Sequence, residues 1–219
     1  KAIDLYLNLI SSNNKALESY YALQRYNLAY CYFQQKEYGL ANQFFRSYEK
    51  MTNDSMRLND TYLRIADGFF MNNEYALSEQ YYEKAIQYNL FDTDYAIYNR
   101  AISLGIIDKN ILKIKLLKEI ISDYSTSSYF EKALYDLAIF YKNTEKTTLA
   151  LEYYNKLLLS TSNQNIIADA RLSKGMIFFK SNKVDDSIKE FLFVINNYQQ
   201  TKYFKEALIA LESAYISQG

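Results

Sequence analysis

The chain has 219 residues, of which 49% are hydrophobic, so it is long enough to bury a substantial core in one large or two ordinary domains. Its 25 basic and 25 acidic residues cancel, so no net charge favours nucleic acid or an anionic membrane surface. It has no histidine, no proline and only 5 glycines, which excludes the usual general base and leaves little material for phosphate-binding loops.

Three further features weigh against catalysis and against membrane insertion. The single cysteine, Cys31, lies in the apolar run LAYCYF, where a buried side chain is expected, and it has no partner for an internal disulfide. The acidic pair Asp185 and Asp186 stands at an expected helix start, where it favours the helix dipole. No run of about 18 apolar residues occurs, so no segment is expected to span a membrane. We expect no enzymatic activity, no cofactor and no metal.

Small residues recur along the chain at intervals of 37, 35, 37 and 37 residues, at Ala29, Ala66, Ala101, Ala138 and Gly175. Within each interval, apolar residues recur three and four apart in two blocks, and a short polar tract such as QQKE or KNTE separates the blocks. This spacing predicts two helices joined by a tight turn.

Each interval also has a second small position, followed four residues later by a large side chain. Small residues allow two helices to approach closely, and a ring fills the space beside the contact. The third interval departs from the pattern, because Lys113 stands at its second small position. The small residues elsewhere are Ala41, Ser78, Ala150 and Ser187, and the rings are Phe45, Tyr82, Tyr154 and Phe191.

In chain order, the pattern predicts a half repeat at 1–16 with only a second helix, and a half repeat at 205–219 with only a first helix. Between them lie five full repeats, at about 22–58, 59–93, 94–130, 131–167 and 168–204. Since solenoids normally end in polar caps, we expect the chain to be an interior part of a longer protein. The alternative is a complete short solenoid with half-repeat ends.

This order of small, small and aromatic positions resembles the tetratricopeptide repeat (TPR), a helix-turn-helix unit of about 34 residues. The resemblance covers essentially the whole chain, 1–219, and implies an all-α, right-handed superhelical solenoid forming a single domain. The chain departs from the family in lacking the first-helix tryptophan and in having no proline at the end of any unit.

The longer period places extra residues after the second helix, in SDYSTSSYFEKAL and NNYQQTKYFKEAL. This form is similar to bacterial envelope TPR proteins, such as the Bam-complex lipoprotein and the Tol-Pal-associated periplasmic protein, although Ser125 and Gln199 stand where those proteins carry proline. The resemblance implies a periplasmic or outer-membrane-associated protein, with the cytoplasm as the alternative.

In the TPR family, the first helix of each repeat lines a concave face that binds extended peptides or helices. Tyrosine suits such a face because it offers a large contact area and a hydroxyl group, although the 24 tyrosines could instead serve mainly in packing. By position, the face would present Tyr26, Asn27, Tyr30, Gln34, Leu63, Arg64, Asp67, Met71, Tyr98, Asn99, Ile102, Tyr135, Asp136, Ile139, Leu172, Ser173 and Met176.

The function that the resemblance implies is a non-enzymatic scaffold for protein partners within a multiprotein assembly. The alternative is a structural spacer or oligomerisation arm whose activity lies in flanking domains. Arg64 with Asn27 and Asn99 reproduces only a fragment of the carboxylate clamp of chaperone-type TPR proteins. We therefore predict that the ligand is not an acidic C-terminal peptide.

Two triplets, Asn53-Asp54-Ser55 and Asn59-Asp60-Thr61, fit the acceptor pattern for N-linked glycans. Both are expected in the loop between the first two full repeats, where a glycan would be tolerated.

Overall fold

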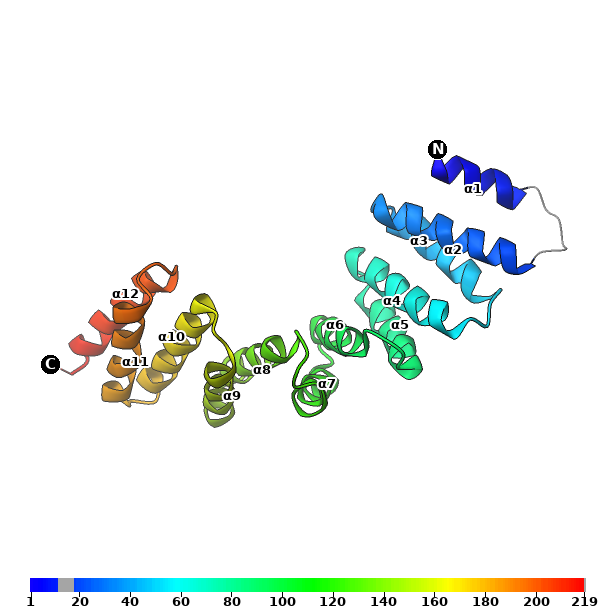
Figure 1. Cartoon of the computed structure of the whole chain (residues 1–219). Helices are drawn as coiled ribbons and strands as arrows, with labels where there is room; N and C mark the ends of the chain where they lie inside the picture. The colour runs from blue at the N-terminus through cyan, green and yellow to red at the C-terminus, as the bar shows by residue number, and fades with distance from the viewer. Residues whose placement is uncertain (12–17, 219) are drawn as a thin grey trace. The chain divides into compact units, whose positions relative to one another are not determined.

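A computed structural model describes residues 1–11 and 18–218 of the chain. This described part is all-α, and its twelve helices follow one another in sequential pairs (Figure 1). The chain divides into two compact units, Lys1–Ser127 and Ser128–Gly219, and each is described by itself. The predicted half repeat at 1–16 reaches into residues 12–16, which lie outside the described residues.

The first unit contains one helix and three helical hairpins, and the second contains two hairpins and one helix. The hairpins pair α2 with α3, α4 with α5, α6 with α7, α8 with α9, and α10 with α11, which confirms the helical hairpins expected from the period. The bounds are α1 Ala2–Ser11, α2 Glu18–Gln34, α3 Tyr38–Glu49, α4 Ser55–Met71, α5 Tyr75–Tyr88, α6 Thr93–Ile106, α7 Asn110–Asp123, α8 Phe130–Asn143, α9 Thr147–Ser160, α10 Gln164–Lys180, α11 Val184–Asn197 and α12 Tyr203–Ile216.

The small and aromatic positions form the core of the hairpins. All four anchoring alanines and all four second small residues are fully buried, and the four rings are at most 1% exposed. In the last hairpin the contact is so close that a Cβ on Gly175 would lie 2.4 Å from Cε1 of Phe191. Burying one such ring contributes roughly 2 kcal/mol to the stability of the fold. The residues that recur in the sequence are thus the residues that form the core.

The third hairpin reaches the same close packing with a different set of residues. A Cβ on Gly105 would lie 2.7 Å from Cδ of Lys113, so the lysine chain lies over this glycine. Leu117, at the position of the ring in the other hairpins, is fully buried. In this hairpin the small residue of the contact is therefore Gly105 on α6, where the other hairpins have one on the second helix. Lys113 of α7 occupies the space beside it.

Each hairpin turn contains one residue with positive φ, and these residues keep the spacing of the repeat. In every turn the N–H after this residue donates to the carbonyl five residues earlier, as Glu37 N does to Tyr32 O at 3.0 Å and Lys146 N does to Tyr141 O at 2.9 Å. This is the Schellman ending of a helix, which is usually made with glycine. The residues here are Lys36, Asn73, Asp108, Glu145 and Asn182.

The long first helices α4 and α10 begin at side-chain caps. Asp54 accepts a hydrogen bond from Arg57 N at 3.1 Å, and Asn163 accepts one from Asn165 N at 3.0 Å. Because α4 begins at Ser55, the second glycan triplet lies inside the helix instead of the expected loop.

Asn59 and Thr61, the two ends of that triplet, are fully buried. The side chain of Asn59 donates to Phe91 O at 3.2 Å. The triplet at 59–61 is therefore excluded as a glycan acceptor, whereas Asn53 and Ser55 are exposed.

Candidate functional site

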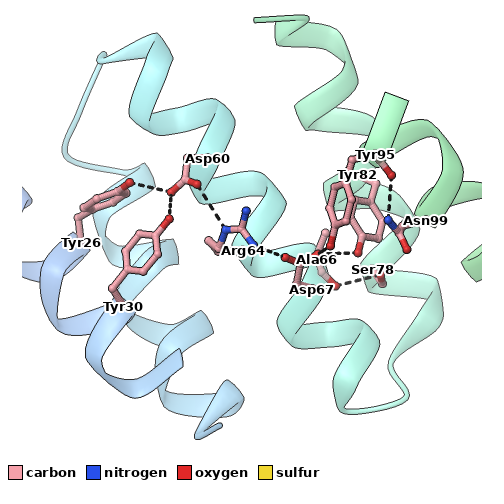
Figure 2. Close-up of polar contacts among 10 residues, drawn as sticks. All are labelled: Tyr26, Tyr30, Asp60, Arg64, Ala66, Asp67, Ser78, Tyr82, Tyr95 and Asn99. Carbon is pink, nitrogen blue, oxygen red and sulfur yellow. Dashed lines mark hydrogen bonds and ion pairs between the residues drawn. The ribbon is translucent and has the colours of Figure 1, made fainter. Parts of the chain in front are cut away.

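The first helices of unit 1 are joined by tyrosine hydroxyls that donate to aspartates (Figure 2). Asp60, in the second turn of α4, accepts from the hydroxyl of Tyr26 at 2.7 Å and from that of Tyr30 through the same oxygen, Oδ2. Nε of Arg64 lies 3.4 Å from the other oxygen of Asp60. Two of the tyrosines predicted to contact a ligand thus tie α2 to α4.

Asp67, two turns further along α4, receives three donors. Nη1 of Arg64 lies 2.6 Å from Oδ2, and the hydroxyls of Tyr82 and Tyr95 donate to Oδ1 at 2.7 Å and 2.5 Å. Asn99 donates to the carbonyl of Tyr95 at 2.9 Å. The connected set, which we call the Tyr-Asp-Arg network, extends over α2, α4, α5 and α6 and so joins three successive hairpins (Figure 2).

The charges of this network are fixed by burial and by one another. Burial raises the pKa of Tyr82 far above its usual value, and the nearby Asp67 raises it further. Burial and the hydrogen bond to Asp60 raise the pKa of Tyr30 to about 12. Burial alone would lower the pKa of Arg64, but Asp67 and Asp60 outweigh it and raise that pKa. Arg64 is therefore a permanent cation already held by two carboxylates.

The corresponding helices of unit 2 form a hollow of about 790 Å³. It is lined by Lys142 of α8, by residues of α10 from Asp169 to Lys180, and by Glu206 of α12. A smaller hollow of about 300 Å³ shares Leu172, Met176 and Glu206 with it, and its other walls are Phe179, Ile209, Ala210 and Ser213. Because the two hollows share three residues, we treat them as one groove across α8, α10 and α12, and we call it the unit 2 groove.

The polar wall of the unit 2 groove contains the same kind of tyrosine-aspartate hydrogen bond as unit 1. The hydroxyl of Tyr135 donates to Oδ2 of Asp169, across the same 34-residue separation as Tyr26 and Asp60. Burial raises the pKa of Tyr135, and Asp169 raises it further. Nζ of Lys142 donates to Oγ of Ser173 at 3.1 Å. Side chains of α8 thus hold two residues of α10 that lie one turn apart on the wall of the groove.

The predicted ligand-binding residues fall into three groups. Tyr26, Tyr30, Arg64, Asp67 and Asn99 belong to the Tyr-Asp-Arg network. Leu172, Ser173 and Met176 line the unit 2 groove, and Tyr135 reaches it through Asp169. The third group takes part in neither arrangement. Leu63 is fully buried and so packs in the core, and Gln34 and Met71 are exposed. The half-buried members are Asn27, Tyr98, Ile102, Asp136 and Ile139, of which the two in unit 2, Asp136 and Ile139, line neither hollow.

Residues that the sequence did not single out as ligand contacts also belong to these arrangements. Asp60, Tyr82 and Tyr95 belong to the network, and Lys142, Asp169 and Glu206 line the groove. A signal existed for two of them, because a tyrosine of one first helix and an aspartate 34 residues later recur at 26 and 60 and at 135 and 169. Nothing comparable marks the others, whose positions follow from side-chain packing.

Within residues 1–11 and 18–218, no group of three or more acidic or cysteine side chains is arranged to hold a metal ion. In the same part of the chain, no helix combines the length and the apolar character needed to cross a bilayer.

No family model matches this chain, and no curated protein matches it significantly. Solved structures do. YrrB, described as a TPR protein with an unusual peptide-binding site, superposes with a TM-score of 0.65 at 14% identity, over 95% of this chain and 96% of that one. The chain has the TPR fold.

Two further structures agree with this assignment. A MamA fragment from Desulfovibrio magneticus RS-1 has a TM-score of 0.62 at 13% identity, over 82% of this chain and 96% of that one. The C-terminal part of a TPR repeat-containing protein from Cytophaga hutchinsonii has a TM-score of 0.58 at 13% identity, over 97% and 88%. The TPR resemblance read from the repeats is thus confirmed as a fold, and the envelope resemblance stays a prediction.

Proposed function

We propose that this TPR chain is a non-enzymatic scaffold that binds an extended segment of another protein within a multiprotein assembly. The observation that carries the proposal is the unit 2 groove, whose larger hollow measures about 790 Å³. Hollows of roughly 300 to 1,000 Å³ are the size at which proteins hold ligands. The peptide-binding site named for YrrB, which shares the fold, supports the same kind of ligand.

The groove offers both kinds of contact that an extended chain needs. Met176 is 39% exposed and lies at the junction of the two hollows, where it provides apolar contact. The charged and hydroxyl groups of Lys142, Asp169 and Ser173 lie beside it and can pair with main-chain or polar groups.

Unit 1 contributes in a different way. Its Tyr-Asp-Arg network joins successive hairpins through buried hydrogen bonds, and Arg64 is already paired with Asp60 and Asp67. This arrangement favours a rigid array of hairpins within unit 1, and it is also the observation that favours the alternative function, a spacer or oligomerisation arm. It further supports the prediction that an acidic C-terminal peptide is not the ligand, because binding one would require breaking these ion pairs.

The test is to select binders from a random-peptide display library with the full chain and then compare variants. We expect Met176→Glu to weaken the selected peptides by about tenfold or more, because a charge would face the apolar wall. Met56→Glu is the matched control, since Met56 is 59% exposed on α4 of unit 1 and lies outside the groove. Failure to select any peptide, or equal binding by both variants, would overturn the proposal and favour the spacer.

The place of action proposed for this scaffold is the bacterial envelope. Its support is the long repeat period alone, and it stays a prediction. Fractionation of the native host, with the chain detected in the periplasm or in the cytoplasm, decides between the two.

A further inference from the structure

We infer that the unit 2 groove selects an extended segment in which a basic residue stands two positions from a large apolar residue. This inference rests on the proposed function and specifies its ligand. It comes from the smaller hollow of the groove, where the carboxylate of Glu206 lies beside apolar side chains of α10 and α12.

The apolar part of the smaller hollow is incompletely covered. Leu172 and Phe179 of α10 line it and are buried and half-buried. Met176 of α10 is 39% exposed and Ile209 of α12 is 66% exposed, so the hollow, which measures about 300 Å³, leaves apolar surface in water. A leucine, methionine or phenylalanine side chain of the ligand would cover this surface.

A carboxylate without a partner lies at the same hollow. Of the described residues that line the smaller hollow, Glu206 alone carries a charge, and its side chain is exposed. No other described residue forms an ion pair or a hydrogen bond with this carboxylate. Lys202, four residues earlier, instead has its ammonium 5.0 Å from the ring centre of Tyr203. Glu206 is therefore free to pair with a lysine or arginine of the ligand.

The larger hollow leaves this negative charge uncompensated. Its hydrogen bond to Ser173 holds Lys142 one turn from Asp169, and Lys180 lines the larger hollow together with Glu145. The charges of these two lysines and two carboxylates cancel. Since Glu206 lines both hollows, the groove as a whole has one net negative charge, and it lies beside the apolar surface.

The spacing along α12 sets the spacing of the two ligand residues. Glu206 precedes Ile209 by three residues and Ala210 by four, which at 1.5 Å per residue is about 5 to 6 Å along the helix axis. In an extended chain, side chains two positions apart point to the same side and are about 7 Å apart. Adjacent side chains point to opposite sides, so the basic and the apolar residue must stand two positions apart to reach α12 together.

The test compares the peptides that three full-length proteins select from the random-peptide display library: the wild type, Glu206→Lys and Glu212→Lys. We expect the wild type to enrich lysine or arginine two positions from a large apolar residue, and Glu206→Lys to enrich aspartate or glutamate there instead. Glu212→Lys is the matched control and should keep the wild-type preference, because Glu212 is exposed on the same helix and lines neither hollow. Circular dichroism checks that the variants fold, as expected for substitutions at exposed helix positions.

A binding titration then measures the contribution of the charge. In the tightest peptide selected by the wild type, glutamine replaces the basic residue. We expect the wild type to bind the unchanged peptide about fivefold more tightly than the substituted one, and Glu206→Gln to bind the two equally. The preference of the wild type should shrink as salt is added.

Each other result has a definite meaning. The same enriched residues in the wild type and in Glu206→Lys would contradict the inference while leaving the proposed function standing, and so would a preference that persists in Glu206→Gln. Failure of the wild type to select any peptide would overturn the proposed function itself. A dimer of the chain that dissociates in Ile209→Lys would assign the smaller hollow to a second copy and would overturn the inference.

Discussion

Tyr82 combines a packing role and a polar role in one side chain. Its ring fills the aromatic position of the second hairpin and is 1% exposed, while its hydroxyl donates to Asp67 at 2.7 Å. Ionising this phenol would bury a second negative charge beside the carboxylate, which is why its pKa lies far above the usual tyrosine value of about 10. Above about pH 10, Tyr82 therefore keeps its proton in the folded chain and loses it in the unfolded chain.

This difference predicts how stability depends on alkaline pH. Since the pKa of Tyr82 is raised by folding, its contribution is complete below about pH 10 and is lost as pH rises above that value, at about 1.4 kcal/mol per pH unit. Tyr82→Phe should therefore show a shallower fall in unfolding free energy above about pH 10, after a loss of about 1 kcal/mol near neutral pH from the missing hydrogen bond. Urea unfolding at a series of pH values measures both. Tyr20→Phe, at a tyrosine that is 48% exposed, is the control, and an unchanged slope in Tyr82→Phe would contradict the argument.

At the scale of single helices, two glycines show that the same close contact can be made in a rigid or an adjustable way. Gly175 of α10 faces the ring of Phe191, which is fully buried, whereas Gly105 of α6 faces the outer carbons of Lys113, which can move aside. A methyl group added at these two positions therefore meets very different resistance.

Gly175→Ala should destabilise the chain by about 1 to 3 kcal/mol, because the ring must move within a packed core. Gly105→Ala should be neutral or stabilising by up to about 1 kcal/mol, because alanine favours the helix and the lysine can yield. Thermal and urea unfolding of the two variants measure the difference. Equal effects would show that the side chain facing the glycine does not decide the outcome.

At the scale of the whole molecule, the division into two compact units implies that a core substitution destabilises mainly the unit that contains it. Each hairpin packs mainly against its neighbours in the chain, as in other repeat proteins. Local unfolding should therefore follow the unit in which a contact is removed.

Phe191→Ala is expected to remove about 3 to 5 kcal/mol of stability by leaving a cavity. Amide hydrogen exchange should accelerate in α10, α11 and α12 more than in α2 to α5. Phe45→Ala, the equivalent change in unit 1, should produce the opposite pattern. A uniform acceleration in both variants would show that the chain unfolds as one cooperative body.

The sequence predicted well what depends on local period and poorly what depends on how repeats stack. Buried positions such as Ala29 and Phe45 followed from their spacing alone, because a helix places them on one face. The partners of Asp60 and Asp67 did not, since they depend on the rotamers of tyrosines from other hairpins. The division after Ser127 left no mark either, because the interval from Ala101 to Ala138 is the regular 37 residues.

The five left-handed turn residues have a consequence for how such a chain is recognised. Helix endings of this kind are usually marked by glycine, yet here the backbone adopts them with lysine, asparagine, aspartate and glutamate. Each non-glycine residue costs roughly 1 kcal/mol in this conformation, and packing of the hairpins on both sides offsets that cost. None of these five turn residues is glycine, whereas all five have a positive φ and follow the spacing of the repeat. Backbone geometry can thus keep the turns of a repeat in register where no single residue type marks them.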